Sequence, residues 1–85
     1  MPYIKKEDRD RFEAFIKLLN EQDIRTSGEL NYLITMITHK YLNQKPESYS
    51  MYNDVIGAIE GAKIELCRRH VALYENEKIK ENGDV

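Results

Sequence analysis

The sequence predicts an all-α protein built from three antiparallel helices, the last of which is much longer than the others. Three stretches place apolar residues three and four positions apart, which is the spacing of one helix face. No stretch alternates apolar and polar residues as a half-buried strand does. Short connections between successive helices favour antiparallel neighbours. The 85 residues, 41% apolar and 33% charged, suit one small globular domain rather than a disordered or fibrous chain.

The first helix is predicted from Glu7 to Asn20. Its apolar residues follow the pattern i, i+3, i+4 and i+7, namely Phe12, Phe15, Ile16 and Leu19. Carboxylates occupy its first turn, where they stabilise the positive end of the helix dipole. The polar segment from Glu21 to Arg25 breaks the apolar pattern and ends the helix.

The second helix is predicted to begin at a capping box. Thr26 supplies a hydroxyl at the N-cap, and Glu29 supplies a carboxylate three residues later. The apolar stripe that follows consists of Leu30, Leu33, Ile34, Ile37 and Tyr41. We expect the helix to stop between Asn43 and Pro46, because proline disfavours α geometry in the residue before it.

The third helix is predicted from about Ser48 to Tyr74, a stretch without proline. Its stripe consists of Tyr52, Val55, Ile56, Ile59, Ala62, Lys63, Leu66 and Leu73. Gly57 and Gly61 each weaken a helix by about 1 kcal/mol relative to alanine. Something else in the structure should therefore compensate for the two glycines.

The predicted length of the third helix bears on assembly. It would be near 40 Å long at about 1.5 Å per residue, whereas a compact chain of this size has a radius of gyration of roughly 12 Å. We therefore expect a homodimer or larger assembly in which this helix supplies the interface. The alternative is a monomer in which the helix breaks near Tyr74 or earlier.

Residues 1–74 are expected to form a single helical domain, and residues 75–85 an acidic C-terminal tail or a short terminal helix ended by Gly83. The tail carries two basic and four acidic side chains, so the formal net charge of −2 arises there. Charges balance over the rest of the chain, which leaves no basic field to hold nucleic acid or an anionic membrane. We expect neither of these partners.

The expected location is the cytoplasm. Cys67 is the only cysteine, so no internal disulfide can form. The N-terminal residues lack the apolar run of a signal peptide, and no stretch approaches the roughly 18 apolar residues that a membrane span needs.

Polar and small residues of the long helix, joined by two residues of the second helix, form a candidate ligand-binding site. The set is Asn31, Tyr32, Asn53, Gly57, Glu60, Gly61, Glu65, Arg68 and Arg69. Arginine pairs hold phosphate or carboxylate groups bidentately, and a nearby glutamate, Glu60 or Glu65, would orient water.

The same residues have a second interpretation that needs no ligand. Glu65 precedes the two arginines by three and four residues, which is the spacing of intrahelical ion pairs. Arginines near the C-terminal end of a helix are favourable there in any case. Gly57 and Gly61 suit the close approach of another helix as well as that of a ligand.

No metal site or cofactor is predicted. Cys67 and His70 lie three residues apart on one helix, but a structural zinc needs four ligands and the chain offers only His39 besides. Two copies could complete such a set across a dimer axis. Serines fall at helix starts, where hydroxyls cap, and neither histidine has a visible catalytic partner.

Several short motifs occur together along nearly the whole chain. They are Pro2-Tyr3-Ile4 with Arg9 or Arg11, the run from Gly28 to Thr35, Tyr52-Asn53-Asp54, the run from Gly57 to Glu60, Lys63-Ile64-Glu65 with Arg68-Arg69, Tyr74-Glu75 with Lys78, and the run from Asn82 to Val85. Together they resemble a family of short helical proteins of unknown function from microbes and their viruses. The resemblance implies the fold and carries no activity.

The leading hypothesis for function is a non-enzymatic interaction or adaptor protein that forms a homo-oligomer. The alternative is an enzyme or a small anionic-ligand binder that uses the polar face of the long helix. A third hypothesis is that this is a viral or host protein that docks on another protein through its acidic tail at residues 75–85.

Overall fold

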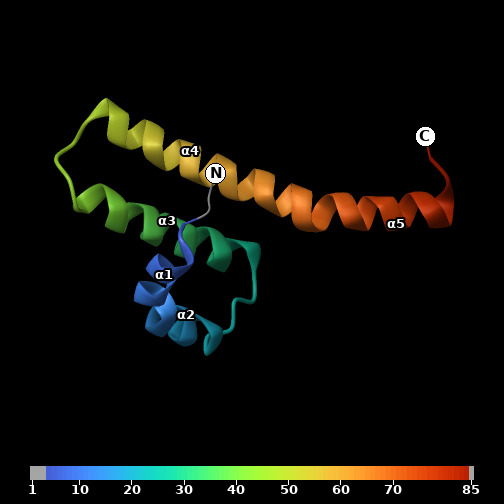
Figure 1. Ribbon diagram of the computed structural model, residues 1–85, viewed down its shortest axis with the longest axis horizontal. Coiled ribbons are helices and arrows are strands. Elements are labelled where there is room, and N and C mark those ends of the chain that lie inside the picture. Colours follow the sequence, from blue (N-terminus) through green and yellow to red (C-terminus); the bar gives the residue numbers. More distant parts are fainter. Residues whose placement is uncertain (1–3, 85) are drawn as a thin grey trace. The chain divides into compact units, whose positions relative to one another are not determined.

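Figure 1 shows a computed structural model of the chain, in which residues 4–84 are described. These residues form three helical stretches joined by two short connections, and no strand occurs among them. The prediction of an all-α fold with one long C-terminal helix is confirmed. Pro2, Tyr3 and Val85, which carry part of the family resemblance, lie outside the described residues. The chain divides into two compact units between Met51 and Tyr52.

The first helical stretch of the first unit consists of three consecutive elements. α1 spans Lys6–Arg9, a 3₁₀ turn spans Asp10–Phe12, and α2 spans Glu13–Asn20. The acidic residues of the first turn lie where the sequence places them. At the other end, the Glu21 N–H donates to the Leu18 carbonyl at 3.1 Å, which tightens the last turn.

α3 spans Ser27–Asn43 and begins at the predicted cap. The Glu29 N–H donates to Thr26 Oγ1 at 3.1 Å. The Glu29 carboxylate accepts from the backbone N–H of Arg25 at 2.8 Å. The reciprocal bond thus reaches one residue beyond the N-cap, so that one backbone donor before the helix and one in its first turn are satisfied. α3 ends three residues before Pro46, as expected.

The long helix is continuous from Tyr49 to Asn82. α4 spans Tyr49–Leu66, a five-residue π-helical turn spans Cys67–Val71, and α5 spans Ala72–Asn82. Ser48 caps its start, because its Oγ accepts from the Met51 N–H at 3.1 Å. The helix does not break near Tyr74 or earlier, so that part of the alternative is wrong, whereas the monomeric state that it included stays a prediction.

The long helix ends at a glycine cap. Gly83 adopts a φ of 86°, a value that favours glycine, and its N–H donates to the Ile79 carbonyl at 2.7 Å. The part of the helix inside the second unit, from Tyr52 to Asn82, is roughly 45 Å long at about 1.5 Å per residue.

Apolar side chains in the described residues are mostly exposed to solvent. Met51, at 5% exposure, is the one buried hydrophobic residue among them. The apolar stripes of all three helical stretches are present, but many of their members stay more than 40% exposed. No helix among the described residues combines the length and the apolar character needed to cross a membrane.

Candidate functional site

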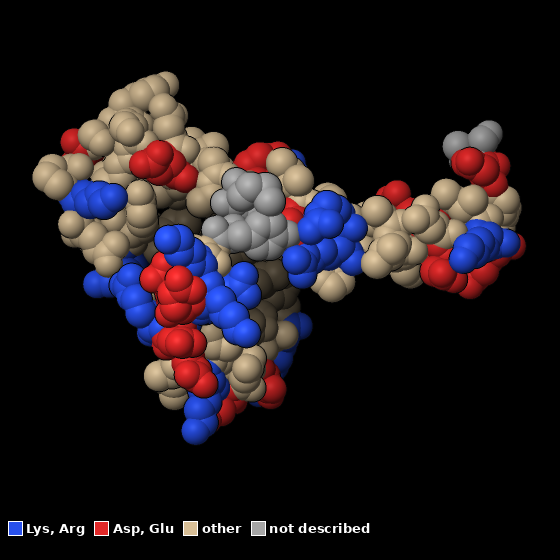
Figure 2. Space-filling view, viewed as in Figure 1, with Lys and Arg blue, Asp and Glu red and all other residues tan. Residues whose placement is uncertain are grey.

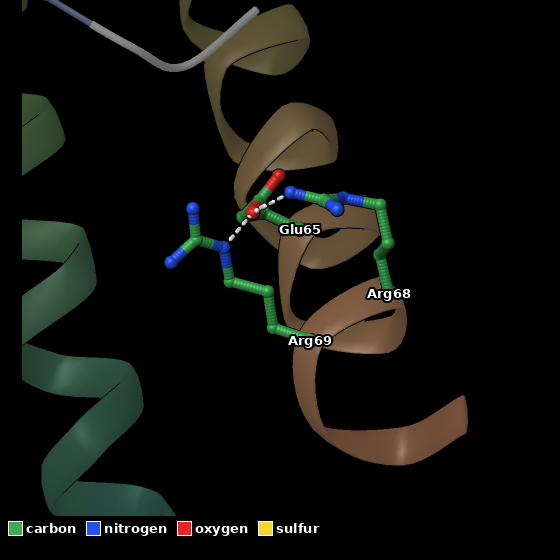
Figure 3. A network of polar contacts seen from close by, with 3 residues as sticks. All are labelled: Glu65, Arg68 and Arg69. Carbon is green, nitrogen blue, oxygen red and sulfur yellow. Dashed lines mark hydrogen bonds and ion pairs between the residues drawn. The ribbon is translucent and has the colours of Figure 1, made fainter. Parts of the chain in front are cut away.

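The structure brings three of the predicted site residues into direct contact. Glu65 Oε1 accepts a hydrogen bond from Arg68 Nη2 at 2.8 Å and another from Arg69 Nε (Figure 3). The two guanidinium groups approach this carboxylate from opposite sides. The Glu65 side chain is 20% exposed, whereas those of Arg68 and Arg69 are more than half exposed. Solvent anions can therefore reach both guanidinium groups.

Backbone geometry explains this convergence. Glu65 lies in the last turn of α4, and both arginines lie in the π-helical turn that follows it. Spacings of three and four residues put all three side chains on neighbouring positions of the helix surface. A π-helical turn inside an α-helix is rare and occurs frequently at functional sites. Sequence reasoning missed this turn, and residues 67–71 contain no glycine or proline that signals it.

Glu60 makes a different contact from the one expected of a site residue. Its Oε1 lies 3.1 Å from Lys63 Nζ, and both side chains are more than half exposed. Asn53, Gly57 and Glu60 follow one another at i, i+4 and i+7 and so share one face of α4. Glu60 therefore forms its own exposed pair with Lys63, separate from the pairs that Glu65 makes with the arginines.

Gly57 and Gly61 border open space. A Cβ atom added at either position would meet no described atom within 4 Å beyond the helix's own backbone. No described part of this chain packs closely against these glycines, so close packing does not compensate for their weak helix propensity.

Asn31 and Tyr32 belong to α3 in the first unit. The Thr35 hydroxyl donates to the Asn31 carbonyl at 2.9 Å, a local bond within one helix turn. Tyr32 is 62% exposed.

The described residues do not assemble a set of metal ligands. Among residues 4–84, no group of three or more histidine, cysteine, aspartate or glutamate side chains lies close enough together to hold an ion. Cys67 is exposed and, like His70, lies in the π-helical turn. What the arrangement offers chemically is an exposed pair of guanidinium groups oriented by one carboxylate.

Charged side chains of both signs cover much of the surface seen in Figure 2.

Comparison with curated proteins finds no match, and comparison with solved structures finds none either. A family model described as "Domain of unknown function (DUF6899)" matches residues 1–85, which is the whole sequence. The chain therefore belongs to this DUF6899 family.

Proposed function

We propose that the protein is a non-enzymatic interaction protein that self-associates, as a homodimer, through its long C-terminal helix. The observation that carries this proposal is the exposure of large apolar side chains along that helix. Ile56, Leu66 and Leu73 are 65%, 53% and 61% exposed. A chain of 85 residues gains little core of its own, and small domains are marginally stable for that reason.

The energetics favour a partner helix over solvent. Burying an exposed leucine or isoleucine side chain contributes about 1.5–3 kcal/mol. Association costs roughly 4–15 kcal/mol of lost translational and rotational freedom. Several such side chains must therefore be covered together, and the long helix offers them in one continuous element.

Self-association is tested by light scattering coupled to size exclusion over a concentration series. One chain has a mass of 10.1 kDa, and the mass measured by light scattering should be about twice that value. Leu73→Gln should weaken the dimer, whereas Leu18→Gln on α2 should leave it intact. Leu18 is a matched control, because both leucines are 61% exposed. A monomer from about 1 to 100 μM would contradict the proposal.

The proposal includes a cytoplasmic location and a microbial or viral source. A single exposed cysteine suits a reducing compartment, where no disulfide is needed. An adaptor role would follow if the assembled helices present a surface to another protein.

A second candidate function is the binding of a small anion by Arg68 and Arg69. The observation that favours it is the convergence of the two exposed guanidinium groups on Glu65 within a π-helical turn. Arginine forks match the planar geometry of carboxylate and phosphate oxygens. Glu65 would then act as the residue that orients the two cations.

Thermal shift with inorganic phosphate tests the second candidate. If the arginines bind phosphate, the melting temperature should rise with phosphate concentration, and Arg68→Gln/Arg69→Gln should abolish that rise. Lys78→Gln/Lys80→Gln removes the same charge from α5, where both lysines are exposed and paired with glutamates, and should preserve the rise. If the melting temperatures of the two double variants respond equally to phosphate, the rise comes from nonspecific screening of charge and the second candidate function is wrong.

A further inference from the structure

The charges of the second unit change sign along the helix axis. Residues 61–71, here called the basic arm, carry three basic side chains and one acidic side chain. Residues 73–84, the acidic arm, carry two basic and four acidic side chains. Ala72 separates the two arms and is the first residue of α5. The helix is thus polarised at its C-terminal half, while residues 61–84 together carry no net charge.

The two arms mirror each other about Ala72 with opposite sign. Lys63 lies nine residues before Ala72, and Glu81 lies nine residues after it, although those nine residues are about two and a half turns and put Glu81 on the side of α5 opposite Ala72. Arg69 lies three residues before Ala72, and Glu75 three residues after it. Each of these cations therefore has an anion at the reflected position of the same helix.

The remaining charges of the basic arm follow the same reflection to within one residue. Glu65, seven residues before Ala72, reflects onto position 79, which lies between Lys78 and Lys80. Arg68 reflects onto position 76, which is next to Glu75 and Glu77. The reflected position of the one acidic residue of the basic arm thus lies between the two basic residues of the acidic arm.

These charges are available at the surface. The side chains of Lys63, Arg68, Arg69, Glu77 and Glu81 are all more than half exposed. The ion pairs described above join side chains three or four residues apart on the helix, as Figure 3 shows for Glu65. Exposed pairs of this kind contribute little stability, so they can exchange for contacts with a second chain at small cost.

Apolar side chains follow the same symmetry. Val71 and Leu73 flank Ala72 and are both exposed. Leu66 lies six residues before Ala72, and Ile79 lies seven residues after it, and both are exposed. In Figure 2 a mostly uncharged stretch, with some acidic atoms at its edge, separates the basic group on the long helix from the mixed charges at its C-terminal end.

We infer that two copies of the chain pair antiparallel along residues 61–84, with the two-fold axis at Ala72. This inference rests on the proposed self-association and specifies its geometry. An antiparallel pair places basic arm against acidic arm twice, because a two-fold axis repeats each contact. A parallel pair in register places like charges together. Electrostatic complementarity fixes orientation and register, while the apolar side chains supply affinity.

A distance measurement tests the geometry on a chain of nearly native charge. In a Cys67→Ser/Asn82→Cys variant, a spin label is attached at position 82, the last residue of α5. Antiparallel pairing about Ala72 separates the two labels by about 30 Å along the axis. Parallel pairing in register brings them to about 10 Å, the usual interaxial spacing. The short distance would overturn the inference.

Charge reversal tests the same geometry by complementation. Arg68→Glu/Arg69→Glu and Glu75→Lys/Glu77→Lys should each weaken self-association about tenfold or more, because both arm contacts then join like charges. An equimolar mixture of the two variants should form heterodimers, because one chain is then basic on both arms and the other acidic on both. Rescue on mixing also shows that each variant remains able to fold.

A matched control and a clear division of outcomes complete the test. Glu21→Lys/Asp23→Lys makes the same charge change outside the arms and should leave the dimer unchanged. If the unaltered chain is monomeric, both the proposed function and this inference fail. If the unaltered chain is dimeric but the reversals have no effect, the inference alone fails and self-association stands.

Discussion

The two units differ in how many helix ends they contain. In the first unit, side chains and tight turns form hydrogen bonds with the backbone groups at the helix ends. The described part of the second unit is one uninterrupted helix. Thr26 and Ser48 both cap helix starts in the first unit. The second unit displays exposed ion pairs along its length, such as Lys63 with Glu60 and Lys78 with Glu81, and the first unit also has such a pair in Asp23 with Arg25. The stability of the first unit therefore depends on the hydrogen bonds at a few helix ends. The stability of the second unit depends on every turn of one helix.

The largest effect should come from proline at the middle of the second unit. Ala72→Pro removes the N–H that donates to the Cys67 carbonyl and adds a ring that clashes with the preceding turn. We expect a loss of at least about 3 kcal/mol and a large drop in helical circular dichroism.

The matched proline substitution in the first unit should be nearly neutral. Ser27 is the first residue of α3, a position that tolerates proline, and Thr26 before it has the extended backbone that proline requires. If Ser27→Pro proves as damaging as Ala72→Pro, the contrast between the two units is lost.

The next effect should come from the cap of α3. Thr26→Ala removes the hydroxyl that accepts from Glu29 N–H, and the unfolding free energy should fall by about 1 kcal/mol. Thr26→Ser keeps the hydroxyl and should retain most of the stability. Urea denaturation followed by circular dichroism measures both variants, and equal midpoints for alanine and serine would contradict the role of this bond.

A pair of glycine substitutions should change stability in opposite directions. Gly57→Ala adds a methyl group in open space on a helix and should stabilise by roughly 0.5–1 kcal/mol. Gly83→Ala forces a side chain into a φ of 86° and should destabilise the end of α5 by about 1 kcal/mol. Position 57 lies outside residues 61–84, along which we infer the pairing, so Gly57→Ala should leave the proposed dimer intact. Destabilisation by Gly57→Ala would place a neighbour against that glycine.

The smallest effect should come from the ion pairs of the second unit. Glu65→Gln removes the negative charge shared by Arg68 and Arg69 but keeps an oxygen that accepts hydrogen bonds, so it should cost a few tenths of a kcal/mol per pair. Glu60→Gln removes a single exposed pair with Lys63 and should cost less. The measurement is the melting temperature of each variant at low salt and at 1 M salt. The two variants should differ at low salt, and the difference between their melting temperatures should vanish at 1 M salt because salt screens the ion pairs.

Local signals made much of the fold predictable. The hydroxyl of Thr26, the carboxylate of Glu29 and the position of Pro46 fixed the ends of α3 to within about a residue. These signals act between residues that are close in sequence, so their chemistry is visible without tertiary structure. The contact of Glu65 with two arginines was predictable for the same reason.

Features that depend on more than local spacing were not predictable. The π-helical turn at residues 67–71 has no residue that marks it. The pair that Glu60 forms with Lys63 is an exception, because its spacing of three residues is local and visible in the sequence. The open space beside Gly57 could not be foreseen, since apolar and small residues in a helical pattern predict packing without naming a partner.

The uninterrupted helix of the second unit has a consequence for how it melts. Each of its turns is held mainly by the turns before and after it, so a single chain should unzip gradually, inward from Asn82. Amide hydrogen exchange would then show a smooth gradient of protection instead of one plateau. A second copy of the chain packed along this helix would couple its turns. The gradual fraying would then become one sharp cooperative unfolding transition.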